Sequence, residues 1–256
     1  MPPSFKPLVL LFVLMLSATA CGGGGAGGGG GTGILPVPPV PQIASVALTL
    51  KIPSIGSTAR FSTPKYVSGG TQQIGITVNG SPVTATSTCS PNAPTICNIT
   101  FSATAGSATI AILLADPFGA PLSTGTVTTT LVANQTNQLH VVFDGIPSSI
   151  SIRFDNPNPS VGTAATVRLF ADVKDAAGYL IVGDPYATPI TVNDSDSSGH
   201  TAIVGSAVLH DPAASVTVQY DGKLLAKPPT FTGSASGVDA TRSTGAQIVP
   251  IVSRGV

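Results

Sequence analysis

The sequence predicts an all-β chain in which two tandem antiparallel β-sandwiches follow an apolar N-terminal segment and a Gly/Pro-rich tether. Short segments of alternating apolar and polar residues recur along the chain, separated by the predicted turn-forming pairs Asn79-Gly80, Asp144-Gly145 and Asp221-Gly222. This pattern is typical of half-buried strands joined by tight turns. All eleven acidic residues are aspartate, which favours turns and caps over helix interiors. Together these observations favour strands and turns throughout the folded part of the chain.

The first 20 residues have the three parts of an export signal. Lys6 supplies one positive charge, residues 8–16 are apolar, and small residues precede Cys21. The nine apolar residues are too few to cross a hydrocarbon core, which takes roughly 20. We therefore predict a signal peptide over residues 1–20 and an exported protein.

The junction Ala18-Thr19-Ala20-Cys21 resembles a bacterial lipoprotein signal, in which small residues precede a cysteine that is lipidated and becomes the mature N-terminus. The commonest form of that signal has leucine where this chain has Ala18. The resemblance implies lipidation of Cys21 and anchoring in the bacterial cell envelope, at the outer membrane or cell surface. Cleavage after Ala20 without lipidation is the alternative.

Residues 21–43 form the predicted tether. Ten glycines and four prolines fill the twenty positions from 22 to 41, so this segment cannot bury a core. We expect a flexible coil over 22–33 and a stiffer, extended polyproline II segment over 34–41. A proline-rich ligand for a recognition domain is the competing interpretation of the second part.

The remainder of the chain is long enough for two sandwich modules, which we place at 44–145 and 146–256. The segment from Asp144-Gly145 to Ser149 interrupts two alternating runs and marks the predicted boundary. The predicted strands share the period-two pattern, and they lie at 46–50, 74–78 and 139–143 in the first module and at 150–154, 167–173 and 216–220 in the second.

The second module contains Val173-Lys-Asp175-Ala-Ala-Gly178-Tyr-Leu-Ile181, followed by Tyr186 and by Pro189-Ile-Thr-Val192. This segment resembles a strand, turn and strand of bacterial immunoglobulin-like domains on cell surfaces, in which an aspartate and a glycine three residues later shape the turn. The resemblance implies immunoglobulin-like β-sandwich modules, although the chain has no tryptophan and this module no cysteine.

A similar string, Asp116-Pro-Phe-Gly119, occurs in the first module. The two strings fall at different distances from the start of their modules. We therefore interpret them as two uses of one turn chemistry rather than as an internal repeat.

The three cysteines are an odd number, and lipidation of Cys21 leaves Cys89 and Cys97 as an even pair. Two prolines lie between them, with strand-like segments on either side. We predict a disulfide that closes the base of a hairpin, which stabilises by roughly 2.5 kcal/mol in the loop-entropy model. Buried free thiols are the alternative, and no histidine or third cysteine lies nearby to make a metal site.

Five of the eleven aspartates fall between Asp172 and Asp196. The string Asp194-Ser-Asp196-Ser-Ser-Gly199 resembles the opening of a calcium loop, but the acidic residue that closes such loops is missing. Asp194 and Asp196 are therefore weak calcium candidates, and a polar turn is the favoured interpretation.

Signs of catalysis are sparse. His200 and His210 flank a short predicted strand and an aspartate can lie near one of them in the fold. Serine is so common in this chain that a Ser-His-Asp coincidence carries little information, and no Gly-x-Ser-x-Gly elbow is present. We predict no catalytic residue, no cofactor and no enzymatic activity.

Charged residues make up 9% of the chain and the net charge is zero, which gives no electrostatic case for nucleic acid. The predicted function is that of a lipid-anchored cell-surface structural or adhesive protein. Its expected partners are the membrane, through the N-terminal lipid, and an envelope polymer or surface protein. A carbohydrate- or envelope-polymer-binding lipoprotein is the second hypothesis, which the absence of tryptophan disfavours, and an enzyme is the third.

Overall fold

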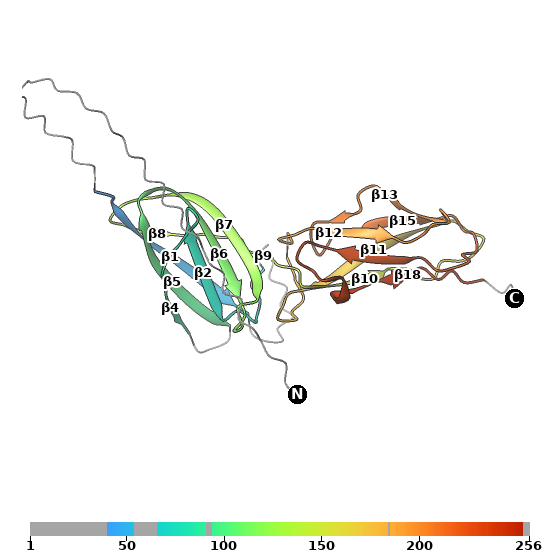
Figure 1. Cartoon of the computed structure of the whole chain (residues 1–256), viewed down its shortest axis with the longest axis horizontal. Helices are drawn as coiled ribbons and strands as arrows, with labels where there is room; N and C mark the ends of the chain where they lie inside the picture. Colours follow the sequence, from blue (N-terminus) through green and yellow to red (C-terminus); the bar gives the residue numbers. More distant parts are fainter. Residues whose placement is uncertain (1–39, 54–65, 91–93, 184, 253–256) are drawn as a thin grey trace, which may run out of the picture. The chain divides into compact units, whose positions relative to one another are not determined.

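The computed structural model describes residues 40–53, 66–90, 94–183 and 185–252. These residues belong to one compact unit that spans 40–256. Strands dominate it, and within the described ranges the single helical element is the 3-10 turn η1 (Ala240–Arg242). The predicted all-β fold is confirmed (Figure 1). The predicted signal peptide, Cys21 and residues 22–39 of the predicted tether lie outside the described residues.

Two sheets form the N-terminal sandwich. The first has the strand order β4-β5-β1-β8 and the second the order β3-β2-β6-β7-β9. The strands of the first sheet are β1 (Ile43–Ile52), β4 (Thr86–Cys89), β5 (Thr95–Thr104) and β8 (Thr136–Gln138). Those of the second are β2 (Gln73–Val78), β3 (Ser81–Pro82), β6 (Gly106–Ala115), β7 (Pro121–Leu131) and β9 (Asp144–Gly145).

Two further sheets form the C-terminal sandwich, with the strand orders β13-β15-β11-β10-β17 and β14-β12-β16-β18. The strands of the first sheet are β10 (Ser149–Phe154), β11 (Ala165–Lys174), β13 (Thr201–Val204), β15 (Val216–Tyr220) and β17 (Ser243–Thr244). Those of the second are β12 (Ile190–Asp194), β14 (Val208–Leu209), β16 (Thr230–Ser234) and β18 (Ala246–Gln247).

Both sandwiches divide their last strand between two sheets. In the N-terminal sandwich β8 pairs with β1 and β9 pairs with β7, and in the C-terminal sandwich β17 pairs with β10 and β18 with β16. The first strand of each module has the same neighbours, because β1 lies between the antiparallel β5 and the parallel β8, and β10 lies between the antiparallel β11 and the parallel β17. In both modules the chain therefore returns at its end to lie parallel to the first strand.

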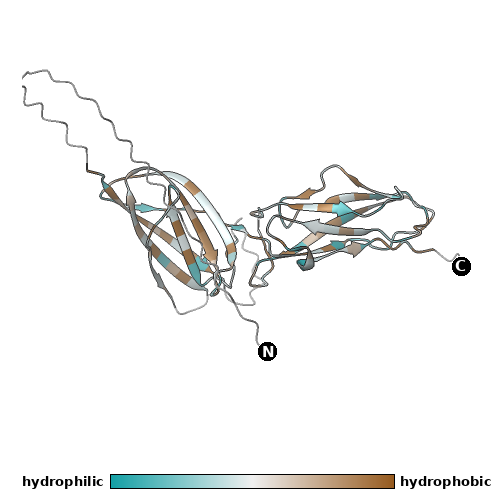
Figure 2. Cartoon of the chain, in the orientation of Figure 1, coloured by the Kyte–Doolittle hydropathy of each residue, from teal (hydrophilic) through white to brown (hydrophobic). Residues whose placement is uncertain are grey.

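Each sandwich encloses its own hydrophobic core. Val46 and Ile99 from one sheet meet Ile110 and Ile112 from the other in the N-terminal core. The C-terminal core contains side chains from both of its sheets, including Leu169, Val218, Ile190 and Phe231. Burying one such side chain stabilises a fold by about 1.5–3 kcal/mol, and Figure 2 shows the apolar residues spread in short bands along the strands of both sandwiches.

Most predicted strands are confirmed, with their alternating faces. Val46, Leu48 and Leu50 of β1 point into the core while Thr49 and Lys51 are exposed. The predictions at 74–78, 150–154, 167–173 and 216–220 correspond to β2, β10, β11 and β15. The turn at Asn79-Gly80 is confirmed as well, since both residues have positive φ (50° and 80°) in the two-residue connection from β2 to β3.

The strand predicted at 139–143 is wrong, although its burial pattern is right. Leu139, Val141 and Phe143 are buried, but the segment belongs to neither ladder because the chain crosses there from β8 in one sheet to β9 in the other. Alternation of side chains therefore continues where strand pairing does not.

The turn predicted at Asp144-Gly145 is also wrong, because these two residues form β9 and pair with Thr124 and Ser123. Gly145 serves close packing there: a Cβ at this position would lie 2.5 Å from Ile181 Cγ2 and 2.8 Å from Tyr66 Cδ1. The residue is a glycine because its neighbours occupy the space of a side chain. The boundary between 145 and 146 stays a prediction.

Candidate functional site

The predicted disulfide is confirmed. Cys89 and Cys97 are bonded, and they are direct cross-strand partners at the loop end of the β4–β5 hairpin. The bond therefore closes the base of the connection between these strands, as predicted. Disulfides of this kind are typical of exported proteins.

The two calcium candidates lie in a polar turn between β12 and β13. Asp194 accepts a hydrogen bond from the Asp196 backbone N–H (2.8 Å), and Asp196 accepts one from the N–H of Ser198 (2.8 Å) and one from that of Thr201 (2.7 Å). The Thr201 hydroxyl also donates to Asp194, at 2.9 Å. The two carboxylates thus act as acceptors that hold the turn.

The electrostatics of this turn follow from the same contacts. Burial acts to raise the pKa of Asp196, but the hydrogen bonds from Ser198 and Thr201 outweigh it and hold that pKa well below its ordinary value of 3.8. In the described part of the chain, no three His, Cys, Asp or Glu side chains gather closely enough to hold a metal ion. Calcium binding by Asp194 and Asp196 stays a prediction.

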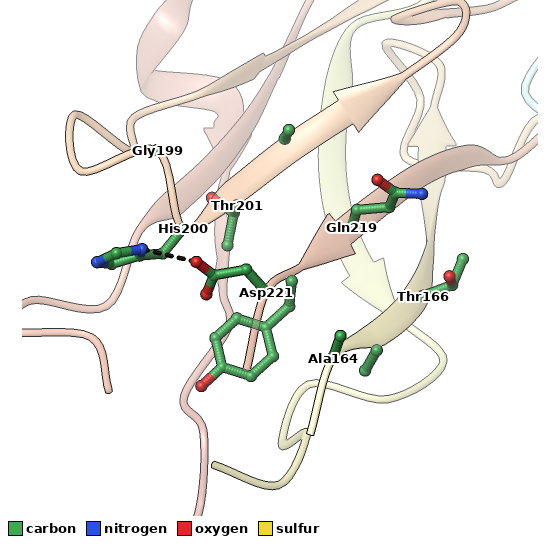
Figure 3. A pocket seen from close by; sticks show the side chains of 10 residues that line it. Ala164, Thr166, Gly199, His200, Thr201, Gln219 and Asp221 are labelled. Atoms are coloured by element: carbon green, nitrogen blue, oxygen red, sulfur yellow. Dashed lines mark hydrogen bonds and ion pairs between the residues drawn. The ribbon is translucent and has the colours of Figure 1, made fainter. Parts of the chain in front are cut away.

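A surface hollow of about 460 Å³ lies beside the ends of β13 and β15 (Figure 3). Its wall carries His200 and Asp221, whose side chains meet at 2.9 Å between Nδ1 and Oδ2. Lys223 Nζ lies 3.3 Å from the same oxygen. The pKa of Asp221 is lowered by a hydrogen bond from the Lys223 backbone N–H and then by the His200 and Lys223 side chains. The carboxylate in the hollow is therefore already paired with two basic side chains.

The lining of the hollow limits its chemistry. Gln219, Thr166 and small side chains such as Ala164 complete the wall, which contains no serine or cysteine nucleophile. The structure therefore brings His200 to an aspartate, as considered from the sequence, but without the third member of a triad. His210 is not among the lining residues, and its carbonyl accepts the backbone N–H of Tyr186.

The two Asp-x-x-Gly strings form the same turn. The N–H of Asp116 donates to Ala120 O at 3.0 Å, and the N–H of Gly119 donates to Asp116 O at 3.1 Å. The corresponding bonds of the other turn, from Asp175 to Tyr179 O and from Gly178 to Asp175 O, are both 3.0 Å.

Two further features match between these turns. The carboxylate of each aspartate accepts the N–H four residues later, at 2.8 Å from Ala120 and 3.0 Å from Tyr179. Gly119 and Gly178 have nearly equal positive φ, 85° and 84°. One turn chemistry therefore serves twice, as the sequence predicts.

The environments of the two turns differ. Asp116 is half-buried at the tip of the β6–β7 hairpin, whereas Asp175 is buried at 2% exposure. The second oxygen of Asp175 accepts a hydrogen bond from the hydroxyl of Tyr66 at 2.7 Å. Burial, followed by the charge of Asp175, raises the pKa of Tyr66 far above its ordinary value of 10.0, so the phenol keeps the proton that it donates.

Tyr66 connects the two cores. Its backbone N–H donates to the carbonyl of Phe143, a residue of the N-terminal core, at 2.9 Å. Its ring is buried within the C-terminal core. Nearby, a Cβ on Gly70 would lie 2.6 Å from the Cβ of Ala177 in the Asp175 turn. Residues from the connection between β1 and β2 therefore pack directly on the Asp175 turn of the C-terminal sandwich.

Other buried polar groups lie near Gly145, which packs against Tyr66. Ser123 pairs with Gly145, and Gly145 forms a backbone bridge with Tyr186. Ser123 Oγ and Tyr186 Oη are buried without a hydrogen-bond partner in the described structure. Tyr66 and Tyr186 thus provide two buried phenols in one region, of which one is hydrogen bonded and the other is not.

The sequence did not predict that Tyr66 links the two cores. The aspartate and glycine of the turn were visible in the sequence, but the partner lies 109 positions away from Asp175. No local pattern around Tyr66 signals that its ring enters the other core. The remaining signal is a tyrosine in a connection otherwise rich in serine, threonine and glycine.

Comparisons with known proteins give no family assignment. No known protein family and no curated protein matches the sequence. Within the described residues, no helix is long and apolar enough to span a membrane.

Among solved structures, a β-glycosidase from Bacteroides vulgatus is similar over 80% of this chain and 24% of its own, at 11% identity and a TM-score of 0.31. The Yersinia pseudotuberculosis adhesin InvE is similar over 81% of this chain and 60% of its own, at 16% identity and a TM-score of 0.29. Domains 4–9 of the surface layer protein SbsC are similar over 71% of this chain and 26% of their own, at 18% identity and a TM-score of 0.28. The chain thus spans less than two thirds of each, and similarities this low carry no argument about function.

Proposed function

We propose that this protein is a lipid-anchored structural or adhesive component of the bacterial cell surface. In this proposal Cys21 carries the lipid, residues 22–43 act as a tether, and the two sandwiches form a non-enzymatic spacer. The signal-like segment and the cysteine that ends it support the anchor. The Cys89–Cys97 disulfide supports an oxidising, exported location.

The observation that carries the structural role is the Tyr66–Asp175 hydrogen bond. A flexible linker between two modules needs no buried polar contact between them. Here a buried phenol fixed to Phe143 donates to a buried carboxylate of the other sandwich. A hydrogen bond to a charged group contributes about 1.5–3 kcal/mol, which favours one arrangement of the modules over many.

Small-angle X-ray scattering of the purified protein tests this role. We expect the wild type and the Tyr186→Phe control to scatter as a particle with one interdomain arrangement, and Asp175→Ala to show a broader distribution of dimensions. A wild type as heterogeneous as Asp175→Ala would contradict the spacer.

Metabolic labelling with a fatty acid tests the anchor. Cells producing the wild type should incorporate label into the protein, and cells producing Cys21→Ala should not. Protease added to intact cells should digest the wild-type protein if it is exposed on the surface. An unlabelled wild type would contradict lipidation, and full protection from protease would contradict surface exposure.

A polymer-binding role is the second candidate, and the observation that favours it is an aromatic side chain on the surface. Phe118, at the tip of the β6–β7 hairpin, is 93% exposed. An exposed aromatic ring offers a flat apolar face against which a sugar ring can pack.

A further inference from the structure

The outer face of β7 is a row of threonines. The four consecutive outward positions of this strand are Thr124, Thr126, Thr128 and Thr130, the last three of them exposed. Alternate residues of an antiparallel strand lie about 6.8 Å apart, so the hydroxyls repeat at that spacing. Figure 2 shows β7 mostly in the pale colours of intermediate hydropathy.

The neighbouring strand extends the row sideways. Ser107 and Thr109 of β6 lie opposite Thr130 and Thr128 in the register, and the hydroxyls of Thr109 and Thr128 are 3.1 Å apart. Each hydroxyl has one donor and two acceptor sites, so this pair retains capacity for a ligand. The outward positions of β6 continue with Ala111 and the exposed Leu113, so the face is a two-strand array of hydroxyl and aliphatic groups.

This array carries no formal charge. None of the residues of β2, β6 or β7 is acidic or basic. The outer face of the β10–β11 pair differs, because Arg153, Asp172 and Lys174 lie there. Among the described strands of this sheet, only β9 carries a charged residue, Asp144, which lies opposite Thr124 at the end where Asp116 forms the hairpin turn.

Phe118 stands at that end in a fixed turn. Asp116 accepts the N–H groups of Phe118 and Ala120, both at 2.8 Å. The amide of Gln73, on the outward side of β2, donates to the carbonyl of Pro117 at 2.9 Å. A side chain that is 93% exposed is therefore held on an ordered backbone, which lowers the entropy lost when a ligand binds.

We propose that the outer face of β6 and β7, together with Phe118, binds an extended, uncharged polysaccharide. Repeated hydroxyls match the donors and acceptors of neutral sugars, the methyl groups and the phenyl ring match the apolar faces of sugar rings, and the absence of charge disfavours anionic polymers. The biological location of that polymer rests on the proposed surface function, but the binding itself does not.

Depletion assays with the purified full-length protein test the proposal. The probes are amorphous cellulose, chitin and an insoluble neutral α-glucan, with polygalacturonate as the anionic comparison. We expect retention on at least one neutral polymer and little on polygalacturonate. Phe118→Ala and Thr128→Lys should each weaken that retention about tenfold, the size of effect typical of a contact whose loss costs more than about 1 kcal/mol.

Two matched variants serve as controls. Thr100→Lys adds the same charge to an exposed position of β5, on the other sheet of the same sandwich. Leu224→Ala removes an apolar side chain that is 68% exposed in the C-terminal sandwich. Neither should change retention, and unchanged unfolding midpoints for all four variants would show that the fold is intact.

Absence of retention on every neutral polymer would overturn the proposal, as would retention that Phe118→Ala or Thr128→Lys leaves unchanged. If Thr128→Lys instead abolishes a concentration-dependent dimer and no polymer is retained, the face joins copies of the chain and the proposal is also overturned. None of these results would alter the scattering and labelling tests of the spacer and its anchor.

Discussion

The Asp116 turn and the Asp175 turn have the same backbone and opposite surroundings. Each aspartate accepts the N–H of the residue four positions later, and each turn has a glycine at nearly the same positive φ. The first turn ends a hairpin and holds Phe118 in solvent, whereas the second is buried and receives the hydroxyl of Tyr66. A local sequence pattern thus determines the shape of a turn, and distant residues determine its use.

The largest expected loss of stability comes from removing the carboxylate of Asp175, and removal of the Asp116 carboxylate is its comparison. Asp175→Ala leaves the Tyr66 hydroxyl and the Tyr179 N–H without an acceptor in a buried site, so we expect a loss of about 3 kcal/mol in the free energy of unfolding. Asp116→Ala should cost about 1 kcal/mol because water replaces the carboxylate. Urea unfolding of both variants measures the difference, and equal losses would show that burial does not distinguish the two turns.

The two buried tyrosines provide a narrower comparison. Tyr66→Phe removes the donor to Asp175, and we expect it to cost about 2 kcal/mol. Tyr186→Phe removes a hydroxyl that has no partner among the described residues, and it should leave stability within about 0.5 kcal/mol of the wild type. Thermal and urea unfolding test both, and a Tyr186→Phe variant as unstable as Tyr66→Phe would refute the role of the hydrogen bond.

The two turn glycines should respond alike. A Cβ at Gly119 or at Gly178 would meet no atom within 4 Å, so the cost of alanine comes from the positive φ alone. Each substitution should cost about 1 kcal/mol, despite the different burial of the turns. A difference greater than about 1 kcal/mol between the two variants would mean that the shared backbone geometry is not what the glycines serve.

A third aspartate turn, at Asp196, extends the comparison to the pH dependence of stability. Its folded-state pKa is lowered, so its carboxylate stabilises the fold above the ordinary value of 3.8 and this contribution is lost as the pH falls through the folded-state pKa. Asp196→Asn lacks the titrating group and should lose less stability than the wild type on acidification below about pH 4. Unfolding midpoints measured from pH 7 downward test this, and parallel pH profiles would count against it.

Much of the fold could be predicted from the sequence, because side-chain alternation and turn residues are local signals. The inward faces of β1 and β11 followed from period two, and the turn at Asn79-Gly80 followed from residues that tolerate positive φ. The pair Asp144-Gly145 was mistaken for a turn because glycine has two uses. Here it makes room for Tyr66 and Ile181, and this crowding is visible only in three dimensions.

The candidate sites were predictable to the extent that they are local. The disulfide followed from cysteine parity and from the strand-like flanks of Cys89 and Cys97. The contact between His200 and Asp221 depends on the pairing of β13 with β15, and the array on β6 and β7 depends on their register. Such pairings over long separations cannot be derived from alternation alone, which gives the face of a residue but not its neighbour.

A double-mutant cycle on Tyr66 and Asp175 tests the link between the two sandwiches most directly. The free energy of unfolding is measured for the wild type, Tyr66→Phe, Asp175→Asn and the double variant. If the hydrogen bond joins the modules, the two losses should be coupled by about 1.5 kcal/mol, because the second substitution removes an interaction that is already lost. Losses that add to within about 0.3 kcal/mol would contradict the link.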